Sequence, residues 1–208
     1  MKAIASQLDV SVSSVSLWTR DIELTAEQVV ALAQSNRLHG NQARGQLAHS
    51  RNARARRLDA QREGRDMARG GDPLHQAGCM LYWAEGSKDR NSVQFVNSDA
   101  GMIRYFMRFL AECYAVTVER YCFSVNCYVN NGLTLDEIES YWLDTLDLPR
   151  SALRKAVVNT APRASQQLKR NLPYGTGRLM LHSTAVVQSI YGAIQEYAGF
   201  DQPAWLDL

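Results

Sequence analysis

A single carboxylate at the end of an apolar segment is the residue in this sequence best placed to do chemistry. Glu85 follows the run Gly78–Ala84 (GCMLYWA) and precedes Gly86, a residue type that commonly ends helices. A carboxylate in the last turn of a helix meets the negative end of the helix dipole, which is unfavourable unless a positive group lies near. Lys88, Arg90 or a divalent metal ion would supply that charge. Two interpretations therefore stand side by side: a metal-binding catalytic carboxylate, and a structural Glu85–Lys88 pair at the helix end.

Arginine is concentrated in one stretch of the chain. Residues 37–70 hold nine arginines against three acidic residues, whereas the whole chain has a net charge of only +2. In a helix, two sets of these arginines recur at three- and four-residue spacing along one side: Arg51, Arg54 and Arg57, and then Arg62, Arg65 and Arg69. Neutralisation of DNA phosphates is the function that such a helix suggests, and a solvated surface helix is the alternative. The stretch has no aromatic residue, so stacking on single-stranded bases is not favoured.

The first 20 residues have the apolar spacing of a helix-turn-helix, in which two short helices pack at a steep angle. The positions are Ile4, Ala5, Leu8, Val10, Val15 and Trp18. Asp9 stands in the turn, where this motif usually has a glycine at positive φ, a conformation that Asp tolerates better than most residues. Ser11 is expected to cap the second helix, which would direct Val12, Val15 and Trp18 inward. A generic three-helix packing unit is the alternative.

The exposed face of that second helix would present short hydroxyl groups. Such side chains allow a helix to sit deep in the major groove and to contact phosphates or base edges. With the basic side chains elsewhere, the predicted DNA-contacting residues are Ser11, Ser13, Ser14, Ser16, Thr19, Arg20, Arg51, Arg54, Arg57, Lys88 and Arg90.

Two strand-like segments add weaker candidates for a surface that faces DNA. Ser124, Asn126 and Tyr128 alternate with apolar residues on one of them, and Arg178 and His182 lie on the other. A polar strand face that is merely solvated is the commoner explanation of such a pattern.

The sequence predicts three parts and an α+β fold: a helix-turn-helix domain over 1–36, an Arg-rich connecting helix over 37–71, and an α+β domain over 72–208. The connecting helix is expected to be only partly continuous, with weak points at Gly40, Gly45 and Gly64, and to contribute no core. In the third part, helices are expected over 72–86, from Asp99, from Thr134, briefly after Pro149 and over 184–198, with strands over 92–97, 120–129 and 177–182.

The helix that ends at Glu85 resembles the LAGLIDADG helix of homing endonucleases and of regulators descended from them. The shared features are an apolar helix with small residues, the Ala84-Glu85-Gly86 ending, a following strand, and the Asn97-Ser98-Asp99 step before the next helix. The resemblance implies that two such helices pack together and that each contributes one acid that binds a divalent cation. Only Glu85 matches that position. Because the chain has one copy of the motif, two acids would require a homodimer. Met80 and Trp83 are bulkier than the residues usual at such a helix contact.

Composition limits the remaining choices. The chain has 208 residues, 46% of them hydrophobic, but its apolar runs are far shorter than the roughly 20 residues of a membrane-spanning helix. The first residues have no apolar signal region, so we expect a cytoplasmic protein without a membrane partner. The four cysteines show neither a C-x-x-C pair nor paired histidines, which argues against a zinc site and fits reduced thiols.

These observations lead to one favoured function and two alternatives. The favoured function is that of a sequence-specific double-stranded DNA-binding protein, a transcriptional regulator that needs no cofactor. The first alternative is an Mg²⁺-dependent homing-type endonuclease that acts as a homodimer through Glu85 of each subunit. The second is an interaction module whose basic helix binds an acidic protein.

Overall fold

The computed structural model describes residues 2–20, 22, 25–129, 132–159 and 172–208, with side chains at all of these except 2–3 and 32–44. The chain divides into two compact units, Met1–Arg51 and Asn52–Leu208. We call them the N-terminal unit and the C-terminal unit and describe each by itself.

The N-terminal unit begins with two short helices, α1 (Lys2–Leu8) and α2 (Val12–Trp18). Asp9, in the turn between them, has a φ of +51°, and the Ser11 side chain accepts a hydrogen bond from the backbone N–H of Ser14. Both features were predicted and are confirmed. The expected apolar packing is wrong in part: Ala5 and Val15 are buried, but side chains that the helix-turn-helix pattern places inward are exposed, namely Ile4, Leu8, Val12 and Trp18.

A single long helix, α3 (Ala26–Arg69), follows. A capping box begins this helix: the side chains of Thr25 and Gln28 each accept a hydrogen bond from the backbone N–H of the other residue. The expected weak points are wrong: the helix runs through Gly40, Gly45 and Gly64 without interruption. The division between the two units falls inside this helix, after Arg51, and not near residue 36.

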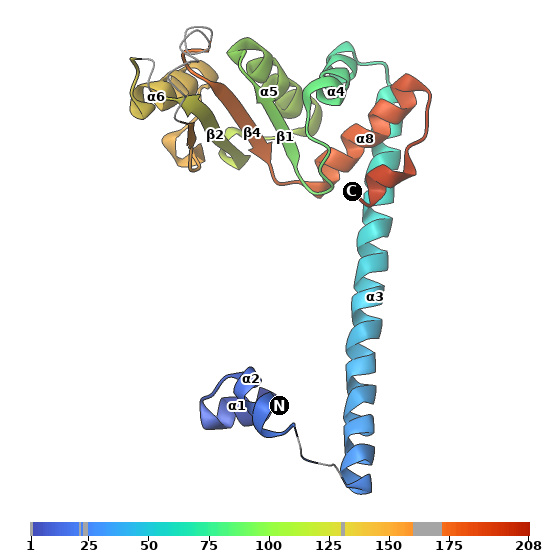
Figure 1. The fold of residues 1–208 in the computed structure, drawn as a ribbon. Coiled ribbons are helices and arrows are strands. Elements are labelled where there is room, and N and C mark those ends of the chain that lie inside the picture. Colours follow the sequence, from blue (N-terminus) through green and yellow to red (C-terminus); the bar gives the residue numbers. More distant parts are fainter. Residues whose placement is uncertain (1, 21, 23–24, 130–131, 160–171) are drawn as a thin grey trace. The chain divides into compact units, whose positions relative to one another are not determined.

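The C-terminal unit is α+β, as predicted (Figure 1). After the end of α3, its elements are α4 (Pro73–Glu85), β1 (Val93–Asn97), α5 (Ala100–Tyr114), η1 (Val118–Arg120), β2 (Tyr121–Tyr128), α6 (Leu135–Leu146), η2 (Arg150–Ala152), β3 (Val157–Asn159), β4 (Thr176–Leu181), α8 (Thr184–Ala198) and η4 (Pro203–Leu206). Three of its α-helices have the predicted N-cap residues, namely Asp72 for α4, Asp99 for α5 and Thr134 for α6. Strand β3 was not predicted, because three residues are too few to show an alternation.

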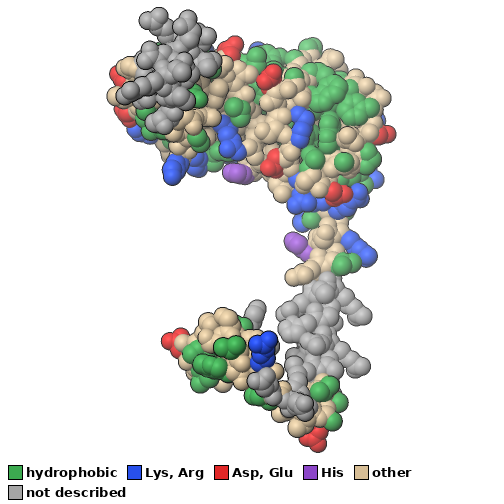
Figure 2. All heavy atoms as spheres, in the orientation of Figure 1, with side chains coloured by type: hydrophobic (Ala, Val, Ile, Leu, Met, Phe, Trp, Pro, Cys, Tyr) green, Lys and Arg blue, Asp and Glu red, His purple; other side chains and the backbone are tan. Residues whose placement is uncertain are grey.

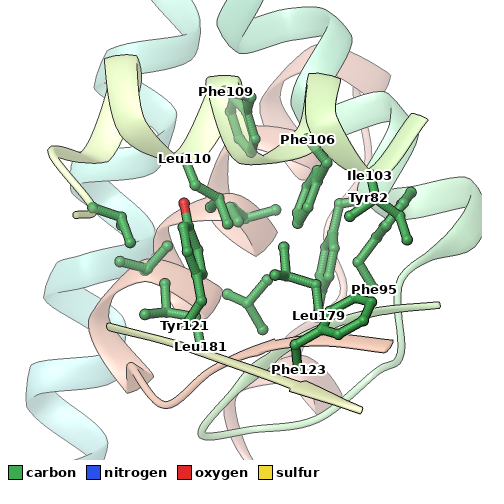
Figure 3. Packing of buried hydrophobic residues seen from close by; sticks show 14 of the residues in the cluster. Tyr82, Phe95, Ile103, Phe106, Phe109, Leu110, Tyr121, Phe123, Leu179 and Leu181 are labelled. Atoms are coloured by element: carbon green, nitrogen blue, oxygen red, sulfur yellow. The ribbon is translucent and has the colours of Figure 1, made fainter. Parts of the chain in front are cut away.

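The four strands form one mixed sheet in the order β1-β4-β2-β3. Strand β4 lies between β1 and β2 and is antiparallel to both, whereas β3 runs parallel to β2. Helix α5 lies across one face of this sheet and directs Phe106, Phe109 and Leu110 toward it (Figure 3). From the strands, Phe95, Phe123, Leu179 and Leu181 complete the same core; all of them are 0 to 1% exposed. The core therefore occupies one face of the sheet and leaves the other face free of it.

The last turns of α3 belong to this unit and pack closely on α8. A Cβ atom added to Gly64 would lie 1.8 Å from the carbonyl oxygen of Ser189, and one added to Gly192 would lie 1.9 Å from that of Gln61. The expectation that the arginine-rich helix contributes no core is therefore wrong for this part, where Ala60 and other side chains are buried. Glycines on both helices bring the two backbones together, and this contact gives α3 a packing role without large apolar residues.

None of the described helices is long and apolar enough to cross a membrane. All four cysteines are free; Cys79 and Cys127 are buried, and Cys113 and Cys122 are partly exposed.

Candidate nucleic-acid interface

The sheet has one face that no part of the core covers. Helices α4, α5, α6 and α8 lie on the core side (Figure 1). Side chains alternate between the two faces of a strand, so the residues between the buried ones point to the opposite side. We call this surface the open face; it consists of Gln94 and Val96 of β1, Cys122, Ser124, Asn126 and Tyr128 of β2, Val157 and Asn159 of β3, and Thr176, Arg178 and Met180 of β4.

The open face carries no negative charge of its own. Strands β1 to β4, all of whose residues are described, contain neither Asp nor Glu, and Arg178 is their one charged side chain. His182 directly follows β4 and is exposed. In Figure 2, basic side chains and a few acidic ones lie along the lower margin of the C-terminal unit, the side on which Figure 1 shows the sheet uncovered. The open face thus combines polar side chains and one positive charge with the exposed Val96 and Val157, and its charge suits a polyanion better than a cation.

Two pairs of side chains are joined across this face by hydrogen bonds. Asn159 Nδ2 donates to Asn126 Oδ1 at 2.6 Å. Arg178 Nη2 donates to Gln94 Oε1. Strand pairing sets Ser124 directly beside Arg178, and Asn126 beside Thr176. Amide, hydroxyl and guanidinium groups therefore lie next to one another on adjacent strands.

Of the predicted sheet residues, Ser124, Asn126, Tyr128 and Arg178 lie on this side of the sheet, as the alternation of the two strands implied, but Ser124 is buried. Gln94, Thr176 and Asn159 were not predicted. The alternation of Val93 and Phe95 around Gln94 was a usable signal, whereas three residues of β3 gave none.

Glu85 is the last residue of α4, and its side chain is exposed. The predicted Glu85–Lys88 pair is not formed. Instead, Lys88 Nζ donates to the carbonyl oxygens of Trp83 at 3.0 Å and Gly86 at 2.8 Å, so it caps the end of α4. Burial lowers the pKa of Lys88. The lysine offsets the helix dipole directly, and Glu85 makes no ion pair with any residue that the structure describes.

A metal site at Glu85 would need further donors. Within the described part of the chain, no three or more side chains of His, Cys, Asp and Glu are grouped so that they could hold a metal ion. One exposed carboxylate therefore does not make a Mg²⁺ site from this chain's described residues, and other ligands would have to come from elsewhere.

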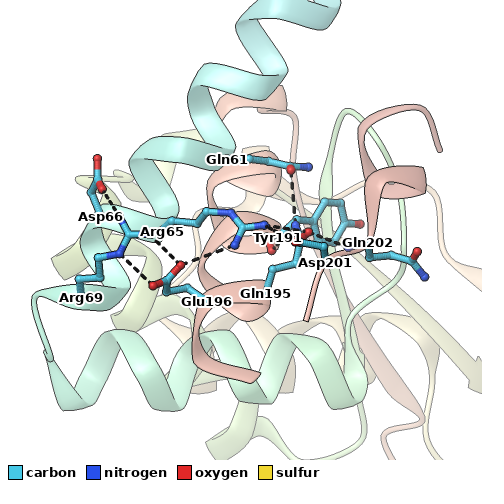
Figure 4. A network of polar contacts seen from close by, with 9 residues as sticks. All are labelled: Gln61, Arg65, Asp66, Arg69, Tyr191, Gln195, Glu196, Asp201 and Gln202. Atoms are coloured by element: carbon cyan, nitrogen blue, oxygen red, sulfur yellow. Dashed lines mark hydrogen bonds and ion pairs between the residues drawn. The ribbon is translucent and has the colours of Figure 1, made fainter. Parts of the chain in front are cut away.

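The arginines of α3 in the C-terminal unit mostly bind acidic residues of the same unit, which runs against the expectation of a row of phosphate contacts. Arg54 and Arg57 both pair with Asp207, at 3.1 and 3.0 Å. Figure 4 shows the neighbouring network, in which Arg65 binds Asp201 at 2.6 Å and Arg69 binds Glu196 at 2.8 Å. Arg51 and Arg56 are exposed and pair with no described residue, so these two remain available to an outside partner. The acidic partners lie more than 100 positions from the arginines in the sequence, so the sequence alone could not predict these ion pairs.

Arg90, predicted to contact DNA, is half-buried. Its Nε atom has no hydrogen-bond partner in the described structure.

The predicted contact residues in α2 and directly beside it divide into two groups. Ser11 caps the helix, its hydroxyl also contacts those of Ser13 and Ser14, and the Thr19 hydroxyl donates to the carbonyl oxygen of Val15 at 2.9 Å. Ser16 and Arg20 are exposed, and their side chains hydrogen-bond to no other described residue.

Comparison of the chain with models of protein families, with curated proteins and with solved structures gave no match.

Proposed function

We propose that this chain is a sequence-specific double-stranded DNA-binding protein that acts as a transcriptional regulator. The observation that carries the proposal is the open face: a sheet surface without acidic residues that presents amides, hydroxyls and one guanidinium. These are the groups that read base edges, since Asn and Gln recognise adenine, Arg recognises guanine, and Ser and Thr accept either partner. β-ribbons and sheets enter DNA grooves in several known classes of DNA-binding protein.

The N-terminal unit supports the same function. Two local features of its short helices support it: Asp9 has a positive φ in the turn between them, and Ser11 caps the second helix. In this proposal α2 enters a major groove with Ser16 and Arg20 exposed, and the free Arg51 and Arg56 contact phosphates. The resemblance of α4 to the LAGLIDADG helix agrees with a nuclease-derived platform that binds DNA, and a homodimer remains a prediction of that resemblance.

Replacing Asn126 with Asp tests the proposal where it is most specific. The two side chains have the same shape, and the new carboxylate can still accept the hydrogen bond from Asn159. It would also place a negative charge on the open face, opposite the phosphates of a bound duplex. We expect Asn126→Asp to weaken binding of the full-length protein to duplex DNA at least tenfold while its melting temperature stays near that of the wild type.

Gln76→Glu is the matched control, because Gln76 is exposed on α4, on the core side of the sheet. It adds the same charge, and we expect it to change DNA affinity by less than about twofold. Equal effects of the two variants would show that only net charge matters, and the open face would then not be the binding surface.

A further inference from the structure

We propose that Arg178 recognises a guanine base in the bound duplex and that Gln94 is the residue that positions it. This inference rests on the proposed DNA-binding function and adds a base and two residue roles to it.

A chain of hydrogen bonds fixes the orientation of Gln94. Asp89 Oδ1 accepts from the backbone N–H groups of Asn91 at 2.7 Å and Ser92 at 3.0 Å. The Nε2 group of Gln94 then donates to the other oxygen of Asp89 at 3.3 Å and to Ser92 Oγ at 3.0 Å. With its amide nitrogen engaged in this way, Gln94 must present its oxygen on the other side, where Arg178 Nη2 donates to it.

The carboxylate at the base of this chain stays ionised over the physiological range. The backbone hydrogen bond from Asn91, reinforced by those from Ser92, lowers the pKa of Asp89. Asp89 therefore keeps its negative charge, and its carboxylate holds the Gln94 amide in one orientation.

What distinguishes Arg178 from the arginines of α3 is that a neutral group holds it. Arg69 and Arg65 bind carboxylates, which neutralise their charge. The Gln94 amide oxygen orients the Arg178 guanidinium and leaves its positive charge intact. Guanidinium has five N–H donors, and Gln94 occupies a donor on one nitrogen, so a second edge of the group is left for a ligand.

The position of Arg178 suits base recognition. It is exposed and lies on β4, between Val96 of β1 and Ser124 of β2, away from the edges of the sheet. A bidentate contact from arginine to O6 and N7 of guanine is the commonest specific contact in the major groove. It depends on the planar fork, which lysine lacks.

The test is selection of duplexes from a randomised pool by the full-length protein, followed by sequencing of the bound fraction. We compare the wild type with Arg178→Lys, which keeps the charge but loses the fork, and with Gln94→Met, which keeps the length but loses the acceptor. Arg20→Lys is the control for guanine contacts made by the N-terminal unit, and Lys155→Gln is the control for a general loss of charge. Thermal melting of each variant checks that it folds.

We expect the wild type to enrich guanine at one position of the selected duplexes. The preference for guanine over the other bases at that position should fall roughly 5- to 150-fold in Arg178→Lys and by a smaller factor in Gln94→Met. Both controls should keep that preference. If Arg178→Lys retains every guanine preference, Arg178 does not recognise a base. If this variant instead loses affinity equally for all sequences, Arg178 contacts a phosphate. In either case the inference is wrong, while the proposed DNA binding stands. If the wild type binds no duplex at all, the proposed function fails and the inference fails with it.

Discussion

At the scale of single residues, the partner that accepts a side chain's hydrogen bonds decides what the side chain can do. Arg54 and Arg57 look like phosphate contacts in the sequence, yet Asp207 pairs with both. Lys88 looks like a partner for Glu85, yet it donates to backbone carbonyls at the end of α4. Residue type and spacing identified basic side chains correctly but did not show which of them an acidic group already engages.

Glu85 provides a prediction at this scale. Its carboxylate is exposed, has no described ion-pair partner and lies in no cluster of metal donors in the described residues. We expect Glu85→Gln to bind duplex DNA within about twofold of the wild type, both with Mg²⁺ and with EDTA. The measurement is fluorescence anisotropy together with electrophoresis of the DNA. Mg²⁺-dependent cutting by the wild type that Glu85→Gln abolishes would establish the endonuclease instead.

His75 provides a second prediction, on pH and stability. The imidazole is 1% exposed and hydrogen-bonds to the hydroxyl groups of Tyr197 at 2.8 Å and Tyr114 at 3.1 Å. Burial lowers the pKa of His75 below 6.5, an effect that Asp72 opposes only in part. The unfolded chain therefore takes up this proton at a higher pH than the folded one. The stability that neutral His75 contributes is complete above about pH 6.5 and is lost as the pH falls toward the folded-state pKa.

We accordingly expect the melting temperature to fall between about pH 7.5 and 5.5, and the fall to be smaller in His75→Gln. His182→Gln, which changes an exposed histidine, is the control and should retain the full dependence. A wild type and a His75→Gln variant with identical pH profiles would show that His75 does not titrate in this range.

At the scale of elements, caps and alternation predicted most of the C-terminal unit. Asp72, Asp99 and Thr134 each cap the start of a helix, as their side-chain chemistry favours, and β2 alternates between the core and the open face. The prediction failed for α3. Its glycines look like interruptions in the sequence, whereas Gly64 allows a close helix contact whose other half, in α8, is more than 100 residues away.

That contact provides a prediction. In Gly64→Ala the new methyl group would overlap the backbone of Ser189, and backbone cannot move aside as a flexible side chain can. We expect a loss of about 2–3 kcal/mol in unfolding free energy, measured by urea denaturation of the C-terminal transition. Gly45→Ala is the control, because nothing lies within 4 Å of the added atom and alanine favours helix; it should be neutral or slightly stabilising. Equal stability of the two variants would mean that α3 and α8 do not pack as described.

The same helix provides a prediction on DNA binding. Arg56 pairs with no described residue, whereas Arg69 pairs with Glu196 and Asp66. Each phosphate contact contributes about 0.9 to the slope of log affinity against log salt concentration. We expect Arg56→Gln to reduce that slope by about one contact and Arg69→Gln to leave it unchanged. A reduced slope in Arg69→Gln would show that its ion pairs open when DNA binds.

At the scale of the whole molecule, the sequence predicted the α+β class and a basic region but not the surface on which the proposal depends. The open face comes from four strands spread over some 85 residues, and one of them, β3, is too short to detect. Strand order decides that Arg178 lies between β1 and β2, and order depends on long-range pairing that local patterns do not specify. The sequence shows that these segments contain no acidic residue. Only the structure shows that their side chains share one face of the sheet, so only the structure identifies a surface without acidic residues.

The measurement that tests the central claim most directly is the affinity of the full-length protein for a labelled duplex across a series of salt concentrations. The proposal predicts binding that weakens as salt rises, about tenfold between roughly 50 and 200 mM for the two phosphate contacts assigned to Arg51 and Arg56, because each contact adds about 0.9 to the slope of log affinity against log salt concentration. Absence of binding at low salt, or an affinity independent of salt, would contradict the claim that this chain is a DNA-binding protein.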